Sequence, residues 1–263
     1  MRRRLLLPVA ALVLIALTAG CAGVGSGPIQ QSTLDAKPAA PYAWDAQATV
    51  HVTVQDNAKF RAVYHLDQRS IQLYRRDGFG GRSPLDVRAV RYRYPNGTII
   101  NGSEFASRGG GIQRTRDVVN VTLPSDASGG GKLAFTADSM PKRFSLPTFV
   151  KGSYEVVLPP NRRIDVPVLG TASPSPSRVS TVGSRTHIYW NDVSGRTISV
   201  QFYLQRDLLV FGAIVAALGL VGIGGLAFYR RQIRRLREQR EEMGLDVEDD
   251  DDVGRGGPPP GMG

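Results

Sequence analysis

An uninterrupted apolar segment near the C-terminus constrains this chain more than any other feature. From Leu208 to Tyr229 there are 22 residues without a charge or a proline. At about 1.5 Å of rise per residue, a helix of this length covers roughly 33 Å, the thickness of the hydrocarbon core of a bilayer. We therefore predict a transmembrane helix over residues 207–229 and a location in the cell membrane.

A cluster of arginines directly after this segment indicates its orientation, because positive residues that flank a span are retained on the cytoplasmic side. The sequence thus predicts a single-pass protein with its N-terminal domain outside and its C-terminus in the cytoplasm. There, a basic helix over 230–245 is followed by an acidic, disordered tail over 246–263. The residues of this orientation signal are Arg230, Arg231, Arg234, Arg235, Arg237 and Arg240.

The N-terminus has the three-part layout of a secretory signal peptide. Three arginines open it, an apolar run covers residues 5–17, and small residues precede Cys21. We predict a signal peptide over residues 1–20 and lipidation of Cys21, with an unmodified or uncleaved N-terminus as the alternative. Residues 21–41 are rich in Gly, Ser, Ala, Gln and Pro, a composition that favours a flexible tether.

Between residues 48 and 204 apolar side chains recur with a period of two, which is typical of β-strands. Within 86–94 the alternation shifts by one residue between Ala89 and Val90, which predicts a β-bulge. Many short strands separated by Gly and Pro predict an all-β domain over 42–206, for which we favour an immunoglobulin-like β-sandwich. The predicted strands are 48–54, 60–66, 70–74, 86–94, 98–100, 118–123, 132–136, 153–158, 186–190 and 197–204.

Residue types that carry chemistry are sparse. Cys21 is the single cysteine, so no disulfide can form within the chain and a thiolate metal site is excluded. The histidines, His51, His65 and His187, fall in predicted strands without a second histidine or cysteine at ligand spacing. Because no catalytic motif is present either, we expect no metal site, no cofactor and no enzyme activity.

The external portion is basic, since residues 21–207 carry a formal charge of +9. This charge indicates either a solvated arginine-rich surface or an acidic partner, such as lipid headgroups or an anionic envelope polymer. A nucleic-acid partner is not expected outside the cell. Small residues in the span allow close helix approach, so self-association through the span is a further prediction. Three Asn-X-Ser/Thr triplets mark candidate N-glycosylation acceptors at Asn96, Asn101 and Asn120.

Several longer segments of the sequence resemble those of a known family. They are Arg-Arg-Asp-Gly-Phe-Gly-Gly at 75–81, Arg-Tyr-Arg-Tyr-Pro-Asn-Gly-Thr at 91–98, Lys-Arg-Phe-Ser-Leu-Pro at 142–147, Ser-Tyr-Glu-Val-Val-Leu-Pro-Pro at 153–160, and Tyr-Arg-Arg at 229–231 running on to Glu-Glu-Met-Gly-Leu-Asp at 241–246. Together they resemble an uncharacterised family of membrane-anchored proteins from halophilic archaea, over most of the chain. The resemblance implies a location and no established activity.

These features together favour a membrane-anchored extracytoplasmic β-sandwich that acts as a binding or interaction module of the cell envelope. It would contact another envelope protein or an acidic polymer. Two alternatives remain: an envelope hydrolase or transferase whose site is assembled from scattered residues, and a signalling or assembly subunit that works through its cytoplasmic tail. Converging carboxylates or histidines in a pocket would favour the hydrolase.

Overall fold

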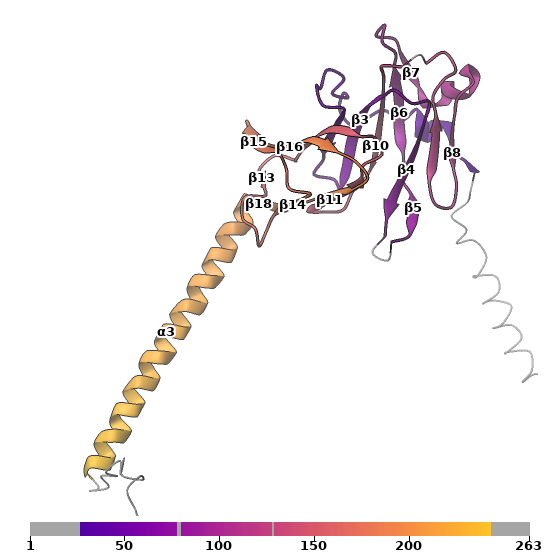
Figure 1. Cartoon of the computed structure of the whole chain (residues 1–263). Helices are drawn as coiled ribbons and strands as arrows, with labels where there is room; N and C mark the ends of the chain where they lie inside the picture. Colours follow the sequence, from indigo (N-terminus) through magenta and orange to yellow (C-terminus); the bar gives the residue numbers. More distant parts are fainter. Residues whose placement is uncertain (1–26, 78–79, 128, 243–263) are drawn as a thin grey trace, which may run out of the picture. The chain divides into compact units, whose positions relative to one another are not determined.

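The computed structural model describes residues 27–77, 80–127 and 129–242 (Figure 1). Contacts within the chain divide it into two units, Met1–Gln205 and Arg206–Gly263. The described part of the first unit is a mostly β-sheet domain, as predicted, and the second contains the apolar helix. The predicted signal peptide, Cys21 and the acidic tail lie outside the described residues.

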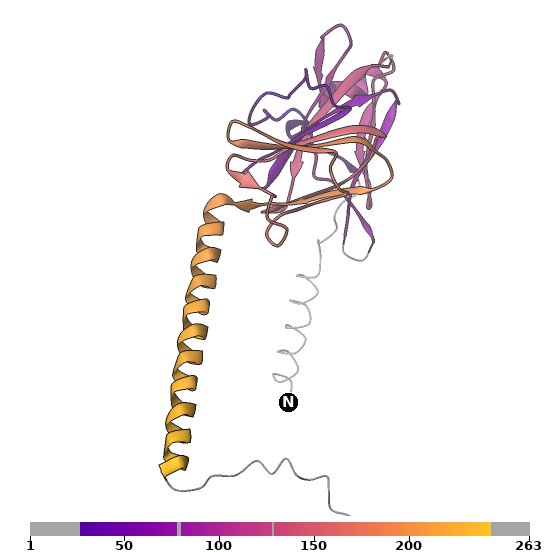
Figure 2. The same cartoon turned by 60° about the vertical axis from the view of Figure 1, so that its left-hand side comes forward.

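Figure 2 shows the β domain in a second view. The largest sheet among its described residues has eight strands. Neighbouring strands run antiparallel, except for one parallel pair between β12 and β2 in the middle of the sheet. In spatial order the strands are β15 (Arg178–Val182), β16 (Arg185–Val193), β12 (Gly152–Val157), β2 (Val50–Val54), β3 (Lys59–Leu66), β10 (Gly131–Asp138), β6 (Arg88–Arg93) and β7 (Ile99–Asn101).

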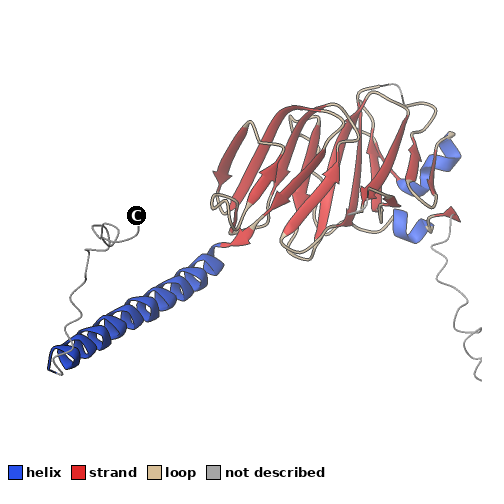
Figure 3. Cartoon of the chain, turned by 60° about the horizontal axis from the view of Figure 1, so that its bottom comes forward, coloured by secondary structure: helices blue, strands red, loops and turns tan. Residues whose placement is uncertain are grey.

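Three smaller sheets complete the domain, which Figure 3 shows as strands throughout with short helical segments at one end. The five-stranded sheet contains β1 (Gly27–Pro28), β8 (Gly111–Arg114), β9 (Val119–Thr122), β4 (Ser70–Arg76) and β5 (Arg82–Pro84). The others are β11 (Arg143–Pro147), β17 (Thr197–Gln201) and β14 (Thr171–Ser173), and the pair β13 (Arg162–Arg163) and β18 (Tyr203–Leu204). The short helical segments are α2 (Gln31–Leu34) and the 3₁₀ helix η1 (Gly102–Arg108). The expected immunoglobulin-like sandwich is not confirmed, since the described strands form several sheets that are not closed.

One hydrophobic core joins the eight-stranded sheet to the five-stranded and three-stranded sheets. The alternation of apolar and polar residues in the sequence explains how the strands form this core, because successive side chains of a strand point to opposite faces of the sheet. Val50, Val52 and Val54 are buried on the inner face of β2. Phe60 of β3 meets Phe144 of β11 edge to face, with ring centroids 5.3 Å apart. Every strand range predicted from the alternation overlaps an observed strand.

The predicted β-bulge is confirmed in β6. Ala134 of β10 pairs with Arg91, whereas Thr136 pairs with Arg88, so two residues of β6 oppose one residue of β10. Ala89 has a φ of 53°, in the left-handed region. The extra residue lets Val87 and Val90, which are three positions apart, both lie in the hydrophobic core.

The tether expected over residues 21–41 does not hold for residues 27–36, which are fixed on the β domain. Gly27–Pro28 forms β1 on the edge of the five-stranded sheet, and Leu34 of α2 is buried in the core. The Asp35 carboxylate accepts hydrogen bonds from the Ser103 amide at 3.1 Å and the Ser103 hydroxyl at 2.6 Å. Composition alone predicted flexibility, but one apolar residue and one carboxylate with complementary partners hold this segment on the domain.

Helix α3 runs without interruption from Gln205 to Glu242. Its apolar portion has a mean hydropathy of 2.4 and is not buried by any part of the chain that the structure describes. Within the described residues it is the one helix long and apolar enough to cross a membrane.

Candidate functional site

The outer face of the eight-stranded sheet, turned away from the core, carries a group of polar side chains. His51 and Thr53 alternate with the buried valines of β2. Glu155 of β12 pairs in register with His51 on one side and with Tyr189 of β16 on the other. Paired residues point to the same face of a sheet, so this register places β2, which carries His51, and β16, which carries His187, on either side of the Glu155 carboxylate.

Glu155 is bound by two histidines at once. Its Oε2 lies 2.9 Å from Nδ1 of His51, and its Oε1 lies 2.8 Å from Nδ1 of His187. The hydrogen bond from His51, with a further one from His187, lowers the pKa of Glu155 to about 2, although burial opposes the shift. An ionised carboxylate can only accept hydrogen bonds, so both Nδ1 atoms carry the proton.

With its proton on Nδ1, the His51 ring directs its other nitrogen toward Thr53. In the neutral ring Nε2 is an acceptor, and the Thr53 hydroxyl lies 3.2 Å from it. Thr53, His51 and Glu155 therefore form a hydroxyl–imidazole–carboxylate series, the order of groups found in hydrolases with an activated hydroxyl nucleophile.

A pocket of about 390 Å³ opens beside this cluster. Arg178 of β15 stacks over the Tyr189 ring, with its guanidinium carbon 4.3 Å from the ring centroid. Burial raises the pKa of Tyr189. The lining includes Gln47, Ser153, Glu155, Arg178, Tyr189 and Asn191. With both carboxylate oxygens of Glu155 occupied by histidines, the guanidinium of Arg178 is the charge that the pocket offers to a ligand.

The other half of the same face is covered. Tyr42 and Trp44 pack over Val63 and Ala134, and the Tyr42 hydroxyl donates to the carbonyl of Ala89 at 2.6 Å. On β2, β12 and β16 the polar side chains of His51, Glu155 and His187 are 11%, 12% and 19% exposed, so the cluster is largely shielded from solvent.

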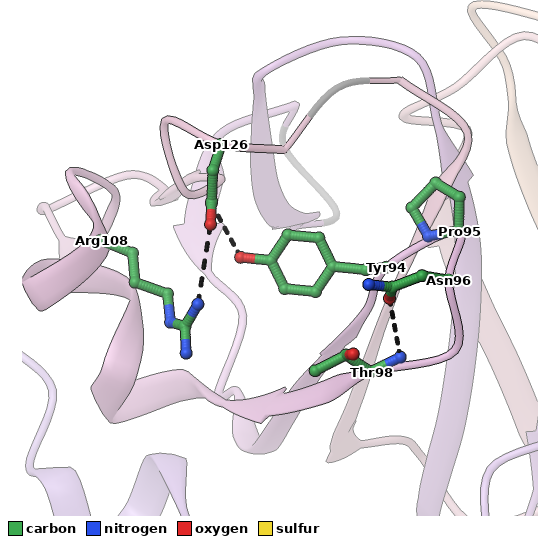
Figure 4. A pocket seen from close by; sticks show the side chains of 6 residues that line it. All are labelled: Tyr94, Pro95, Asn96, Thr98, Arg108 and Asp126. Carbon is green, nitrogen blue, oxygen red and sulfur yellow. Dashed lines mark hydrogen bonds and ion pairs between the residues drawn. The ribbon is translucent and has the colours of Figure 1, made fainter.

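A second pocket, of about 450 Å³, lies at the turn between β6 and β7 (Figure 4). The Tyr94 hydroxyl donates to Asp126 at 2.8 Å, and Arg108 forms an ion pair with the same carboxylate at 3.6 Å. Figure 4 shows Arg108 and Tyr94 converging on Asp126 from two sides, with Asn96 and Thr98 on the turn. Its charged groups are already paired with each other, so we take the Glu155 pocket as the candidate site.

The residues singled out from the sequence lie in separate places. His51 and His187 meet at Glu155, whereas His65 stays apart, and burial lowers its pKa. Asn96 is exposed on its turn, Asn101 precedes η1, and Asn120 lies in β9 between β4 and β8. The six arginines of the orientation signal all lie on α3.

Glu155 and Thr53 were missed by the sequence reasoning. The alternation of β2 places Thr53 on the same face as His51, which is a usable signal. Nothing local, however, reveals that β12 lies beside β2. No group of three or more His, Cys, Asp or Glu in the described ranges could hold a metal ion.

A model of a family of unknown function, DUF5803, matches residues 46–248. The chain belongs to this family. The DUF5803 match begins just before β2 and reaches past the described end of α3, so it includes Glu155, both of its histidines and the apolar helix. It agrees with the resemblance to an uncharacterised family.

Two solved structures are similar to part of this DUF5803 member. One is an M1 zinc metallopeptidase from Deinococcus radiodurans, with 11% identity and a TM-score of 0.30. The other is a variant of that peptidase bound to a Tyr-Ser-Ala substrate, with 12% identity and a TM-score of 0.30. Each match covers 58% of this chain and 40% of the peptidase. No curated protein matches the chain.

Proposed function

We propose that this protein is a membrane-anchored binding module of the cell envelope. Its β domain lies outside the membrane, α3 crosses it once, and the arginines after Tyr229 keep the C-terminus in the cytoplasm. The partner is an acidic polymer or an envelope protein that presents an acidic group, and no nucleic acid is involved. Lipidation of Cys21, glycosylation and self-association through the span belong to the same proposal.

The pocket beside Glu155 carries the proposal. Its polar side chains are held before any ligand arrives, because Glu155 is fixed by two hydrogen bonds and Arg178 by its stacking on Tyr189. Preorganised groups bind with less loss of conformational entropy. The +9 charge of residues 21–207 adds a general attraction for acidic partners.

A matched pair of arginines tests the pocket. Arg178 stacks on Tyr189 in the pocket, and Arg82 stacks on Tyr74 of the five-stranded sheet at 4.6 Å. We expect Arg178→Ala in the full detergent-solubilised chain to weaken binding of a soluble polyuronate such as alginate about fivefold or more. Arg82→Ala removes the same charge and should leave binding nearly unchanged. Equal losses in both variants would show that only the overall charge matters.

The series Thr53, His51 and Glu155 supports a second candidate function, an envelope hydrolase. Thr53 would be the nucleophile, His51 the base that takes its proton, and Glu155 the group that orients His51. We expect hydrolysis of a chromogenic ester by the full chain to be abolished in Thr53→Val and His51→Gln and retained in Thr53→Ser. Turnover that survives both Thr53→Val and His51→Gln would eliminate this candidate.

A further inference from the structure

The two most exposed large apolar side chains of the described β domain are Val168 and Val182, which are 78% and 62% exposed. They are far apart in the sequence, and each lies on a tight turn. The amides of Leu169 and Gly170 both donate to the carbonyl of Val166, which leaves Val168 at the tip of its loop. Val182 begins the hairpin turn between β15 and β16, where it pairs with Arg185.

Both turns lie beside the last residues of the β domain. The loop of Val168 follows β13, which pairs with β18 through Arg163 and Tyr203. The Tyr203 hydroxyl donates to Asp165 in that loop. Val168 is therefore attached to the strand that directly precedes α3.

The turn of Val182 is connected to the same place through Asn161. The Asn161 amide donates to the carbonyl of Ser184 at 2.7 Å, and the Asn161 carbonyl accepts from the amide of Gln205 at 3.3 Å. Arg163 also donates to the hydroxyl of Thr181 at 2.7 Å. We name Arg162, Arg163, Val168, Val182 and Arg185 the exit surface, because they surround the point where the chain leaves the domain.

Chain length places this surface near the bilayer. The uncharged span begins at Leu208, three residues after Gln205. These residues are helical and rise about 4.5 Å, which is less than the roughly 5–8 Å depth of the headgroup layer on one side of a bilayer. The guanidinium groups are held within the domain, since Arg162 pairs with Asp56, Arg163 donates to Thr181 and Arg185 donates to the carbonyl of Leu158, so the exposed valines supply the main attraction for lipid.

We propose that the exit surface rests on the outer leaflet, with Val168 and Val182 inserted among the lipid headgroups. This contact is a second attachment that limits rotation of the β domain about its anchor. Apolar side chains next to basic ones are the composition of surfaces that lie in a membrane interface. The inference depends on the proposed membrane anchoring by α3.

Site-specific fluorescence quenching, measured on the full chain in nanodiscs, tests whether the exit surface contacts lipid. In a Cys21→Ala background, a single cysteine is introduced by Val168→Cys, Val182→Cys, Ile99→Cys or Leu218→Cys and labelled with an environment-sensitive fluorophore. Ile99 is the control, since it is 47% exposed and lies in β7 at the other edge of the eight-stranded sheet. Leu218, in the apolar part of α3, reports insertion of the span.

Lipids with a shallow nitroxide should quench the probes at 168 and 182 at least twofold more than the probe at 99. Lipids with a deep nitroxide should quench the probe at 218. Quenching at 218 together with equal, weak quenching at 168, 182 and 99 would overturn the exit surface and leave the anchor intact. An unquenched probe at 218 would instead overturn the membrane anchoring itself.

Discussion

At the scale of single residues, Glu155 is the group whose chemistry its neighbours change most clearly. Its side chain is 12% exposed and receives a hydrogen bond on each oxygen. Without the histidines, such a carboxylate would be destabilised by burial. With them, its pKa falls to about 2, so it stays ionised at every pH at which the protein is expected to work.

This pKa predicts a specific dependence of stability on pH. The folded pKa is depressed, so Glu155 contributes stability above about pH 4.5 and loses that contribution as the pH falls toward 2. Wild-type protein should exceed Glu155→Gln in free energy of unfolding by about 1–3 kcal/mol near pH 6, and the difference should shrink toward pH 2. Urea unfolding followed by tryptophan fluorescence measures it, because both tryptophans, Trp44 and Trp190, lie in the β domain.

Asp56→Asn is the matched control for this measurement. Asp56 also forms an ion pair, with Arg162 at 3.2 Å, but its side chain is 62% exposed. An exposed pair contributes less than about 1 kcal/mol, so this variant should lose little stability. A Glu155→Gln difference that stays constant from pH 6 to pH 2 would contradict the depressed pKa.

At the scale of elements, Arg91 adds three hydrogen bonds to the contacts that hold the N-terminal segment from β1 to Ala36 on the domain. The guanidinium of Arg91 donates to the carbonyls of Leu34 at 3.2 Å, Asp35 at 2.9 Å and Ala36 at 3.1 Å. Arg91 lies on β6, in the eight-stranded sheet. Together with β1, Leu34 and Asp35, this arginine holds a segment whose composition resembles a linker.

Arg91→Ala should release this segment without unfolding the sheet. We expect hydrogen exchange at residues 29–36 to rise at least tenfold, while exchange in β3 and β10 changes little, because these strands keep their own ladder. Arg93→Ala is the control: Arg93 lies two residues further along β6, and its ion-pair partner Asp45 is 94% exposed. Equal exchange in both variants would mean that packing of Leu34, and not Arg91, holds the segment.

At the scale of the whole molecule, the chain combines a β domain with its own core and a helix whose apolar surface is not covered by any of the residues that the structure describes. Apolar side chains along a helix of this length are stable in lipid and unfavourable in water. The proposed topology follows from this contrast together with the arginines after Tyr229.

Protease protection tests this topology. When protease is added to intact cells that express the chain with a C-terminal tag, the β domain should be degraded and a tagged fragment of α3 and the tail should survive. Permeabilised cells should lose the tag as well, which controls for protease access. A tag that disappears from intact cells, together with an intact β domain, would show the opposite orientation.

The features that local periodicity encodes were predictable from the sequence by itself. Alternation with a period of two predicted the β-domain and the shift at Ala89, and 22 uncharged residues predicted the apolar helix, because side-chain direction and helix length depend only on neighbouring residues. Only the tertiary structure decided which strands are neighbours. Glu155 is 104 residues from His51 and 32 from His187 along the chain, and it meets both because β12 lies between β2 and β16. Strand order depends on how whole sheets bury their apolar faces against one another, and that choice leaves no mark on the spacing of residues within any one strand.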